Sequence, residues 1–304
     1  MATWLILVGV VLVALSSVRL REQVPALPDD APRVAAVEVT ASVRRRLLLM
    51  FGSAAIAATV LVLHGLADPE SFGLLLAIAP GTATAIALLG FIAYPSPRYA
   101  ARHIRSASLE LRTPSRYLSR RAVAGPVAAA AGLVLFLVYA GVTASPDEAG
   151  LSRYIAREDE LGLQVASPFP GWYYGLPLIV LTVVLTGLTV AAVCRIAAAP
   201  ADPDAQTHTF DVYWRQRTSQ LIVLLSTMTL LSYTAGVLFF AGTATQRVAT
   251  AVDQFGEHVL HAGSMTLGWI ETFSALVLLA VAAWLLLGIV DRLLSFALQP
   301  RSVT

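Results

Sequence analysis

The chain has 304 residues, of which 57% are hydrophobic and 13% are charged, and its formal net charge is +2 at pH 7. Soluble domains usually carry about 25% charged residues. The apolar residues stand in long blocks, which excludes an ordinary soluble protein, and the short alternating segments of a membrane β-barrel are not visible. We therefore expect an all-α, polytopic membrane helix bundle that forms one integral membrane domain over residues 1–304.

Seven apolar blocks predict seven transmembrane helices, because about 20 residues cross the hydrocarbon layer as a helix. They run at about 2–18, 47–66, 72–94, 122–144, 174–193, 221–244 and 272–290. The first block is the shortest. Its amino end lacks the positive charge with which a cleaved signal peptide begins, so we interpret it as a retained helix.

The basic residues, which are all arginine, divide unequally between alternate connecting segments. Segments 19–46, 95–121 and 194–220, with the carboxyl tail, hold 18 of the 21. The other segments, which include 145–171 and 246–271, hold Arg153, Arg157 and Arg247. Positively charged loops remain in the cytoplasm. The pattern therefore predicts a multi-pass protein with its amino terminus outside and its carboxyl terminus inside.

The three inner segments are similar to one another. They are 28, 27 and 27 residues long, and each ends in clustered arginines that run into the next span. This favours three hairpin repeats followed by a lone seventh helix. The alternative is that positive-inside bias alone places arginines at both ends of each segment.

The two long outer segments predict surface structure. Residues 151–161 are polar enough for one short surface helix, and the aromatic residues 172–174 stand where an interfacial belt is expected. In 246–271, Val248, Val252, Phe255 and Val259 are spaced by four, three and four residues. That spacing predicts an amphipathic outer helix or an extension of the seventh helix.

The seven apolar cores contain no charged residue, which weighs against an ion-coupled transporter. Two cores carry neutral polar stripes instead. One stripe is Thr182, Thr186 and Thr189, and the other is Ser226, Thr229, Ser232 and Tyr233. Hydrogen bonds between helices explain such stripes; a path for a polar solute is the alternative. In the third block, the Pro80-Gly81 pair predicts a kink.

Residue chemistry restricts cofactors and metals. The absence of lysine excludes covalent attachment of retinal or pyridoxal phosphate, and we predict no cofactor. The single cysteine, Cys194, fits a small packing residue. His258 and His261 are three residues apart, and His64 could approach them from the second block. These histidines are candidate ligands for zinc or copper, with ordinary surface histidines as the alternative.

The inner arginines are candidate contacts for a protein partner or for anionic lipid. Six of them fall within 20 residues: Arg102, Arg105, Arg112, Arg116, Arg120 and Arg121. Headgroup contacts explain such a cluster; a docking surface for a cytoplasmic or membrane protein is the alternative. We do not expect nucleic-acid binding, because no binding fold fits in a tethered segment of 27 residues.

Two stretches, Leu109-Glu110-Leu111-Arg112-Thr113-Pro114-Ser115-Arg116-Tyr117-Leu118 and Phe169-Pro170-Gly171-Trp172-Tyr173-Tyr174-Gly175, carry a resemblance. They resemble segments of uncharacterised multi-pass plasma-membrane proteins from high-GC Gram-positive (actinobacterial) bacteria. The resemblance covers less than a tenth of the chain and implies origin and topology only.

On function, we expect a non-enzymatic accessory, sensor or scaffold protein. One alternative is a permease-like protein for a neutral or amphiphilic solute. A second is an outer-face metal-binding or enzymatic site.

Overall fold

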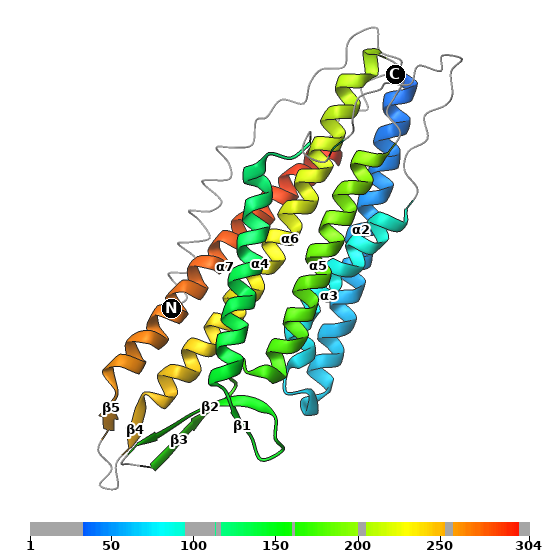
Figure 1. Ribbon diagram of the computed structural model, residues 1–304. Coiled ribbons are helices and arrows are strands. Elements are labelled where there is room, and N and C mark those ends of the chain that lie inside the picture. Colours follow the sequence, from blue (N-terminus) through cyan, green and yellow to red (C-terminus); the bar gives the residue numbers. More distant parts are fainter. Residues whose placement is uncertain are drawn as a thin grey trace.

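The computed structural model describes residues 33–94, 113, 117–159, 162–199, 205–252 and 258–297. Within them lie six helices that are long and apolar enough to cross a membrane. The helices pack lengthwise as an elongated bundle (Figure 1). The protein is thus a multi-pass transmembrane helix bundle, as its composition predicts. The predicted first span, at 2–18, lies outside the described residues.

The six helices match six of the predicted apolar blocks, although most extend beyond them. They are α2 (Arg33–Ala67), α3 (Leu74–Ala93), α4 (Arg120–Thr143), α5 (Trp172–Ala198), α6 (Ala205–Val248) and α7 (Ala262–Ala297). A 3-10 turn (Pro69–Ser71) joins α2 to α3. Pro80 lies inside α3, at the predicted position of the kink.

The connecting segments alternate between two ends of the bundle (Figure 1). One end, which we call the strand-bearing end, holds residues 68–73, 144–159, 162–171, 249–252 and 258–261. At the other end, α3, α5 and α7 finish while α2, α4 and α6 begin. We call this the arginine-bearing end, because Arg46, Arg195, Arg215 and Arg292 lie there. The alternation predicted from the arginines is therefore present in these six helices.

The first outer segment is a small antiparallel sheet. Strands β1 (Ser145–Pro146), β2 (Ser152–Asp159) and β3 (Gly162–Ala166) lie in that order. The prediction of a surface helix over 151–161 is wrong. An isolated polar helix of that length is marginal, whereas pairing β2 with β3 satisfies the backbone of both strands. Gly162, at φ 112°, adopts the left-handed conformation that the tight connection requires.

The second outer segment also differs from its prediction. Strands β4 (Thr250–Val252) and β5 (His258–Leu260) pair antiparallel between α6 and α7. An amphipathic helix over this segment is therefore wrong, and only the part from Ala262 onward extends the seventh helix. Of the apolar residues at helical spacing, Val248 ends α6, Val252 ends β4 and Val259 lies in β5. Phe255 lies outside the described residues.

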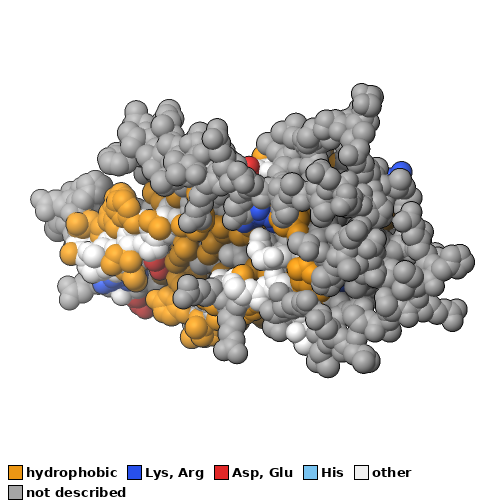
Figure 2. Space-filling view, turned by 90° about the horizontal axis from the view of Figure 1, so that it is seen from above, with side chains coloured by type: hydrophobic (Ala, Val, Ile, Leu, Met, Phe, Trp, Pro, Cys, Tyr) orange, Lys and Arg blue, Asp and Glu red, His pale blue; other side chains and the backbone are white. Residues whose placement is uncertain are grey.

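Helix α6 forms the centre of the bundle and packs against α3, α4, α5 and α7. Its side chains Leu221, Ile222 and Leu230 are almost fully buried. In contrast, only 11% of the residues in the most apolar window of α2 or α4 are buried, against 56% in α6. The described side chains visible in Figure 2 are mostly hydrophobic. The exposed faces of α2 and α4 are therefore apolar surfaces suited to lipid contact.

Candidate functional site

The neutral polar stripes meet one another inside the bundle. The hydroxyls of Thr189 on α5 and Ser226 on α6 are 2.5 Å apart, and those of Thr84 on α3 and Thr229 on α6 are 2.9 Å apart. All four side chains are buried. Thr182 is also buried and donates to the Leu178 carbonyl of its own helix. These contacts match interhelical hydrogen bonding and count against a solute path along these residues.

Tyr233 on α6 inserts its hydroxyl into the backbone of α3 at the proline. The hydroxyl accepts a 2.6 Å hydrogen bond from the Gly81 amide and donates a 2.9 Å bond to the Ile78 carbonyl. Pro80 has no amide hydrogen, which leaves the helix ladder interrupted here. A Cβ on Gly81 would lie 2.1 Å from the tyrosine oxygen. Gly81 is therefore required for α3 to approach α6 this closely.

A buried carboxylate lies at the contact between two of the apolar helices, α6 and α7. Glu271 lies within the α7 candidate span Ala262–Arg292, and it is buried at the α6–α7 contact. It accepts a 3.3 Å hydrogen bond from Thr245. Glu271 directly precedes the predicted core 272–290, which itself contains no charged residue, because α7 begins ten residues before that apolar block.

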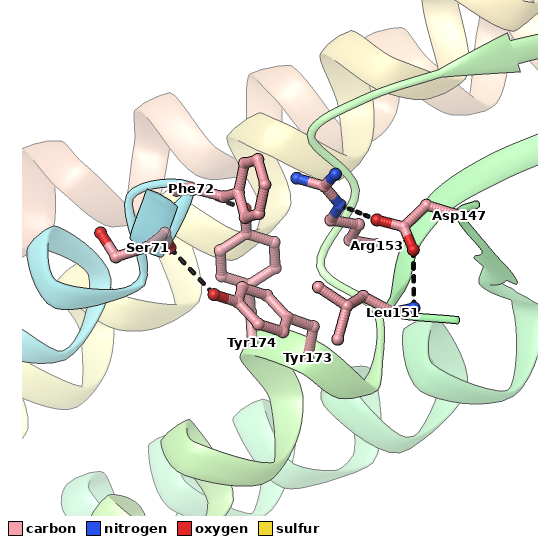
Figure 3. Close-up of polar contacts among 7 residues, drawn as sticks. All are labelled: Ser71, Phe72, Asp147, Leu151, Arg153, Tyr173 and Tyr174. Atoms are coloured by element: carbon pink, nitrogen blue, oxygen red, sulfur yellow. Dashed lines mark hydrogen bonds and ion pairs between the residues drawn. The ribbon is translucent and has the colours of Figure 1, made fainter. Parts of the chain in front are cut away.

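At the strand-bearing end, an ion pair holds the first outer sheet in place (Figure 3). Arg153 on β2 is paired with Asp147, and Asp147 also accepts a 2.7 Å hydrogen bond from the Leu151 amide. The guanidinium lies 3.5 Å from the centre of the Phe72 ring, in the α2–α3 connection. Arg153 thereby links the sheet to a turn about 80 residues earlier in the sequence.

Two tyrosines at the start of α5 complete this contact. Tyr173 donates to the Ser71 carbonyl at 3.0 Å, and Tyr174 donates to the Phe72 carbonyl at 2.7 Å. Phe72 has φ 47°, which side-chain-bearing residues seldom adopt. The hydrogen bond to its carbonyl and the arginine over its ring hold it there. The aromatic residues predicted as an interfacial belt thus bind the α2–α3 turn.

Electrostatics stabilise the ionised Asp147 carboxylate. Desolvation by burial raises the pKa of this group. The hydrogen bond from Leu151 and the charge of Arg153 outweigh it, so the net pKa lies below the usual value. The same contact raises the pKa of Arg153 against its own desolvation. We refer to Ser71, Phe72, Asp147, Arg153, Tyr173 and Tyr174 as the outer cluster. It contains no nucleophile with an adjacent base, and its contacts are structural.

The predicted metal ligands belong to a helix, a strand and the residue that links that strand to α7. His64 is exposed in the last turn of α2, His258 begins β5, and His261 follows β5, where its amide donates to the Ala249 carbonyl. His258 and His261 therefore do not share a helical face. Among the described residues, no group of three or more His, Cys, Asp or Glu is placed to hold a metal ion. The side chain of His258 lies outside the described part, so metal binding stays a prediction.

At the arginine-bearing end, two buried arginines bind the carboxyl ends of neighbouring helices. Arg46 on α2 donates to the Phe91 and Tyr94 carbonyls, at 3.0 and 3.1 Å, where α3 ends. Arg215 on α6 donates to the Ile196 and Ala199 carbonyls, at 2.7 and 3.0 Å, where α5 ends. The last carbonyls of a helix lack partners within it and carry partial negative charge. These arginines are helix caps.

A groove of about 470 Å³ lies beside these caps, between α4, α6 and α7. Its polar lining is Tyr213, Gln216, Arg217, Gln220 and Arg292. Its remaining lining is apolar or small: Ala122 and Gly125 from α4, and Val223, Leu224 and Thr227 from α6. None of the described residues that line it is acidic. We call it the inner groove.

The side chains of the six arginines predicted as partner or lipid contacts lie outside the described part of the structure. Arg120 and Arg121 form the first turn of α4, next to Ala122 in the inner groove. Arg102, Arg105, Arg112 and Arg116 lie outside the described residues. Sequence reasoning missed Arg217 and Arg292 as a pair, because they are on different helices. The spacing of Tyr213, Arg217, Gln220 and Leu224 along one helical face was the available signal.

The fold defines the protein as a multi-pass transmembrane helix bundle with short paired strands at one end and an arginine-lined groove at the opposite end. No protein-family model matches the chain, and neither the curated proteins nor the solved structures contain a significant match. Function is therefore inferred from this chain's own residues.

Proposed function

We propose that this protein is a non-enzymatic accessory, sensor or scaffold protein of a bacterial plasma membrane. It crosses the membrane seven times, with residues 2–18 as the first span. Its amino terminus lies outside, and its arginine-bearing end faces the cytoplasm. In each of three similar hairpins, the two helices are joined by an inner segment, 19–46, 95–121 or 194–220. These inner segments contact a protein partner and anionic lipid.

The observation that carries this proposal is the pairing of polar groups in the bundle interior. Hydroxyl–hydroxyl hydrogen bonds join Thr84 to Thr229 and Thr189 to Ser226. The Tyr233 hydroxyl donates to the α3 backbone. A bundle whose buried hydrogen bonds join helices in this way suits a fixed support better than a moving transporter. A permanent platform has the further advantage of presenting its loops in constant positions.

The orientation can be tested with the single cysteine. Cys194 is exposed in the last turns of α5, at the arginine-bearing end. In intact cells, a membrane-impermeant maleimide is expected to leave Cys194 unlabelled until the cells are opened. The matched reporter is Cys194→Ser with Glu158→Cys on β2, which is expected to react from outside. Labelling of Cys194 in sealed cells would reverse the topology.

The accessory role can be tested by purifying the tagged full chain from its native membranes in mild detergent. A protein that accompanies it in constant ratio is expected, and charge removal by Arg102→Gln, Arg105→Gln, Arg112→Gln and Arg116→Gln together is expected to release it. Arg157→Gln on β2 is the control on the opposite end. Repeated recovery of the chain alone would contradict the proposal.

Glu271 is the specific observation that favours the transport alternative. A carboxylate inside a span commonly marks an ion or proton pathway, and this one contacts Thr245 at the α6–α7 crossing. If the protein is a permease, Glu271→Gln abolishes solute uptake by reconstituted vesicles while the chain remains folded. If it is an accessory protein, the same variant retains its partner.

A further inference from the structure

We propose that the inner groove binds an anionic phospholipid. Its phosphate lies between Arg217 and Arg292, and an acyl chain lies along α6 beside Val223 and Leu224. This site is separate from the outer cluster. It depends on the helix bundle alone and stands whether or not the protein has an accessory role.

The groove lies at the depth where a headgroup meets the hydrocarbon. Arg292 is the last residue of the α7 candidate span, and the α4 span begins at Ala122. Arg217 lies in the second turn of the α6 span, Asp211–Val248. Thr227 is ten residues further along α6, about 15 Å deeper at the helical rise per residue. The groove thus extends from the boundary of three spans into the apolar layer.

The side chains change character along that depth in the order an amphiphile requires. Tyr213, Gln216, Arg217 and Gln220 lie on one face of α6 at the boundary. They are followed by Val223 and Leu224, which are buried and partly buried apolar residues. A soluble anion would use only the first group. A phospholipid uses both, because its phosphate and its acyl chain are joined.

The charge of the groove selects the headgroup. In the part of the lining that the structure describes, there are two guanidinium groups, two side-chain amides and no carboxylate. Arginine binds phosphate oxygens with paired donors. The Arg217 guanidinium lies 5.3 Å from the centre of the Tyr213 ring, which holds it on the groove side of α6. A net-negative headgroup is therefore favoured over a zwitterionic one.

The α4 wall leaves the space that the lipid occupies. Gly125 faces α6, where a Cβ would lie 3.9 Å from the Thr227 methyl group, and its neighbour on this wall is the small residue Ala122. A larger side chain at Gly125 would enter the groove without changing its charge. This position allows a test by shape that is independent of the arginines.

The test is lipid retention by the purified full chain. Protein is reconstituted in phosphatidylcholine bilayers that contain a tenth phosphatidylglycerol, is released into mild detergent, and is analysed by native mass spectrometry. We expect one phosphatidylglycerol per chain. Arg217→Gln or Arg292→Gln should each weaken retention on the order of fivefold, because one arginine near a membrane surface contributes about that factor in binding anionic lipid. The matched control is Arg195→Gln, which removes an exposed charge at the same end.

Gly125→Leu should also lose the lipid although both arginines remain. Circular dichroism and elution as a single species check that each variant is folded. The proposal would be overturned if the two groove-arginine variants and Gly125→Leu retained as much lipid as the Arg195→Gln control. So would a wild type that holds phosphatidylcholine as well as phosphatidylglycerol, or none, as expected if another segment of the chain fills the groove. Release of the lipid by millimolar inorganic phosphate alone would assign the site to free phosphate instead.

Discussion

The two ends of the bundle use arginine in different ways. At the strand-bearing end, Arg153 pairs with Asp147, Arg157 donates to Ser264 at 2.5 Å, and Arg247 donates to the Ser167 carbonyl at 3.0 Å. The ion pair of Arg153 lies within one connecting segment, whereas Arg157 and Arg247 join that segment to α7 and α6. At the arginine-bearing end, Arg46 and Arg215 instead bind the carbonyls at which helices finish.

This difference shows that the number of arginines and their role are separate matters. Their number predicts which end faces the cytoplasm. Their role depends on burial: Arg46 and Arg215 are each 7% exposed, whereas Arg195 is exposed. The buried arginines stabilise the bundle, whereas an exposed one such as Arg195 adds charge to its surface.

The largest predicted effect is at the Arg215 cap. Arg215→Met removes the donors to Ile196 and Ala199 and leaves Asp211, to which Arg215 also donates at 2.9 Å, buried without its cation. Breaking one side of a buried ion pair costs about 3–5 kcal/mol. We expect this loss in the free energy of unfolding, measured by denaturant titration in detergent.

Arg195→Met is the control for that measurement. It also removes one arginine charge, but from an exposed side chain in the last turn of α5. We expect a change within about 0.5 kcal/mol. If both variants lost equal stability, net charge rather than helix capping would explain the arginines at this end.

A smaller effect is predicted between the two ends, at the contact of Tyr233 on α6 with the backbone of α3. Gly81→Ala places a methyl group on the Tyr233 hydroxyl and displaces it from the Gly81 amide and the Ile78 carbonyl. An unsatisfied buried polar group costs about 1–3 kcal/mol. The measurement is again the free energy of unfolding in detergent.

The control for this contact is Gly132→Ala, since a Cβ there meets no atom within 4 Å. Its stability is expected to be unchanged or slightly higher. A second check is Gly81→Ala in a Tyr233→Leu background, which lacks the ring and the hydroxyl. There the glycine substitution should cost less. Additive costs would show that Tyr233 does not support α3.

The helices were predictable because the bilayer imposes a single requirement on each of them. Every backbone group in hydrocarbon must be satisfied within a helix, so an apolar run predicts the element directly. The six described spans and their alternation between two ends follow from that rule. The contact of Tyr233 with Gly81 does not, because it joins residues 152 positions apart.

The outer segments were predicted poorly for the opposite reason. In water, a polar stretch such as Ser152–Asp159 is free to form a helix or a strand, and its pairing with Gly162–Ala166 decides between them. Glu271 was missed because an apolar run marks the lipid-facing part of a helix. The helix itself begins earlier, at Ala262, where α7 follows strand β5.

The smallest effect is predicted for acidification of the outer cluster. The pKa of Asp147 is lower in the folded protein than its usual value of 3.8, because the Leu151 amide and Arg153 outweigh its desolvation. The ionised carboxylate therefore contributes stability at every pH above that usual value. The contribution is lost as the pH falls through the lowered folded pKa.

Hydrogen exchange of residues 145–159, corrected for intrinsic rates, measures this contribution. Between pH 5 and pH 8 we expect constant protection; below about pH 4 the exchange should become severalfold faster in these residues than in α6. Asp147→Asn should exchange at the faster rate at every pH. Protection that is lost near neutral pH, or that is equal in the two proteins, would show that the ion pair does not hold the sheet. The strand-bearing end would then depend on the hydrogen bonds that Tyr173 and Tyr174 donate to the Ser71 and Phe72 carbonyls.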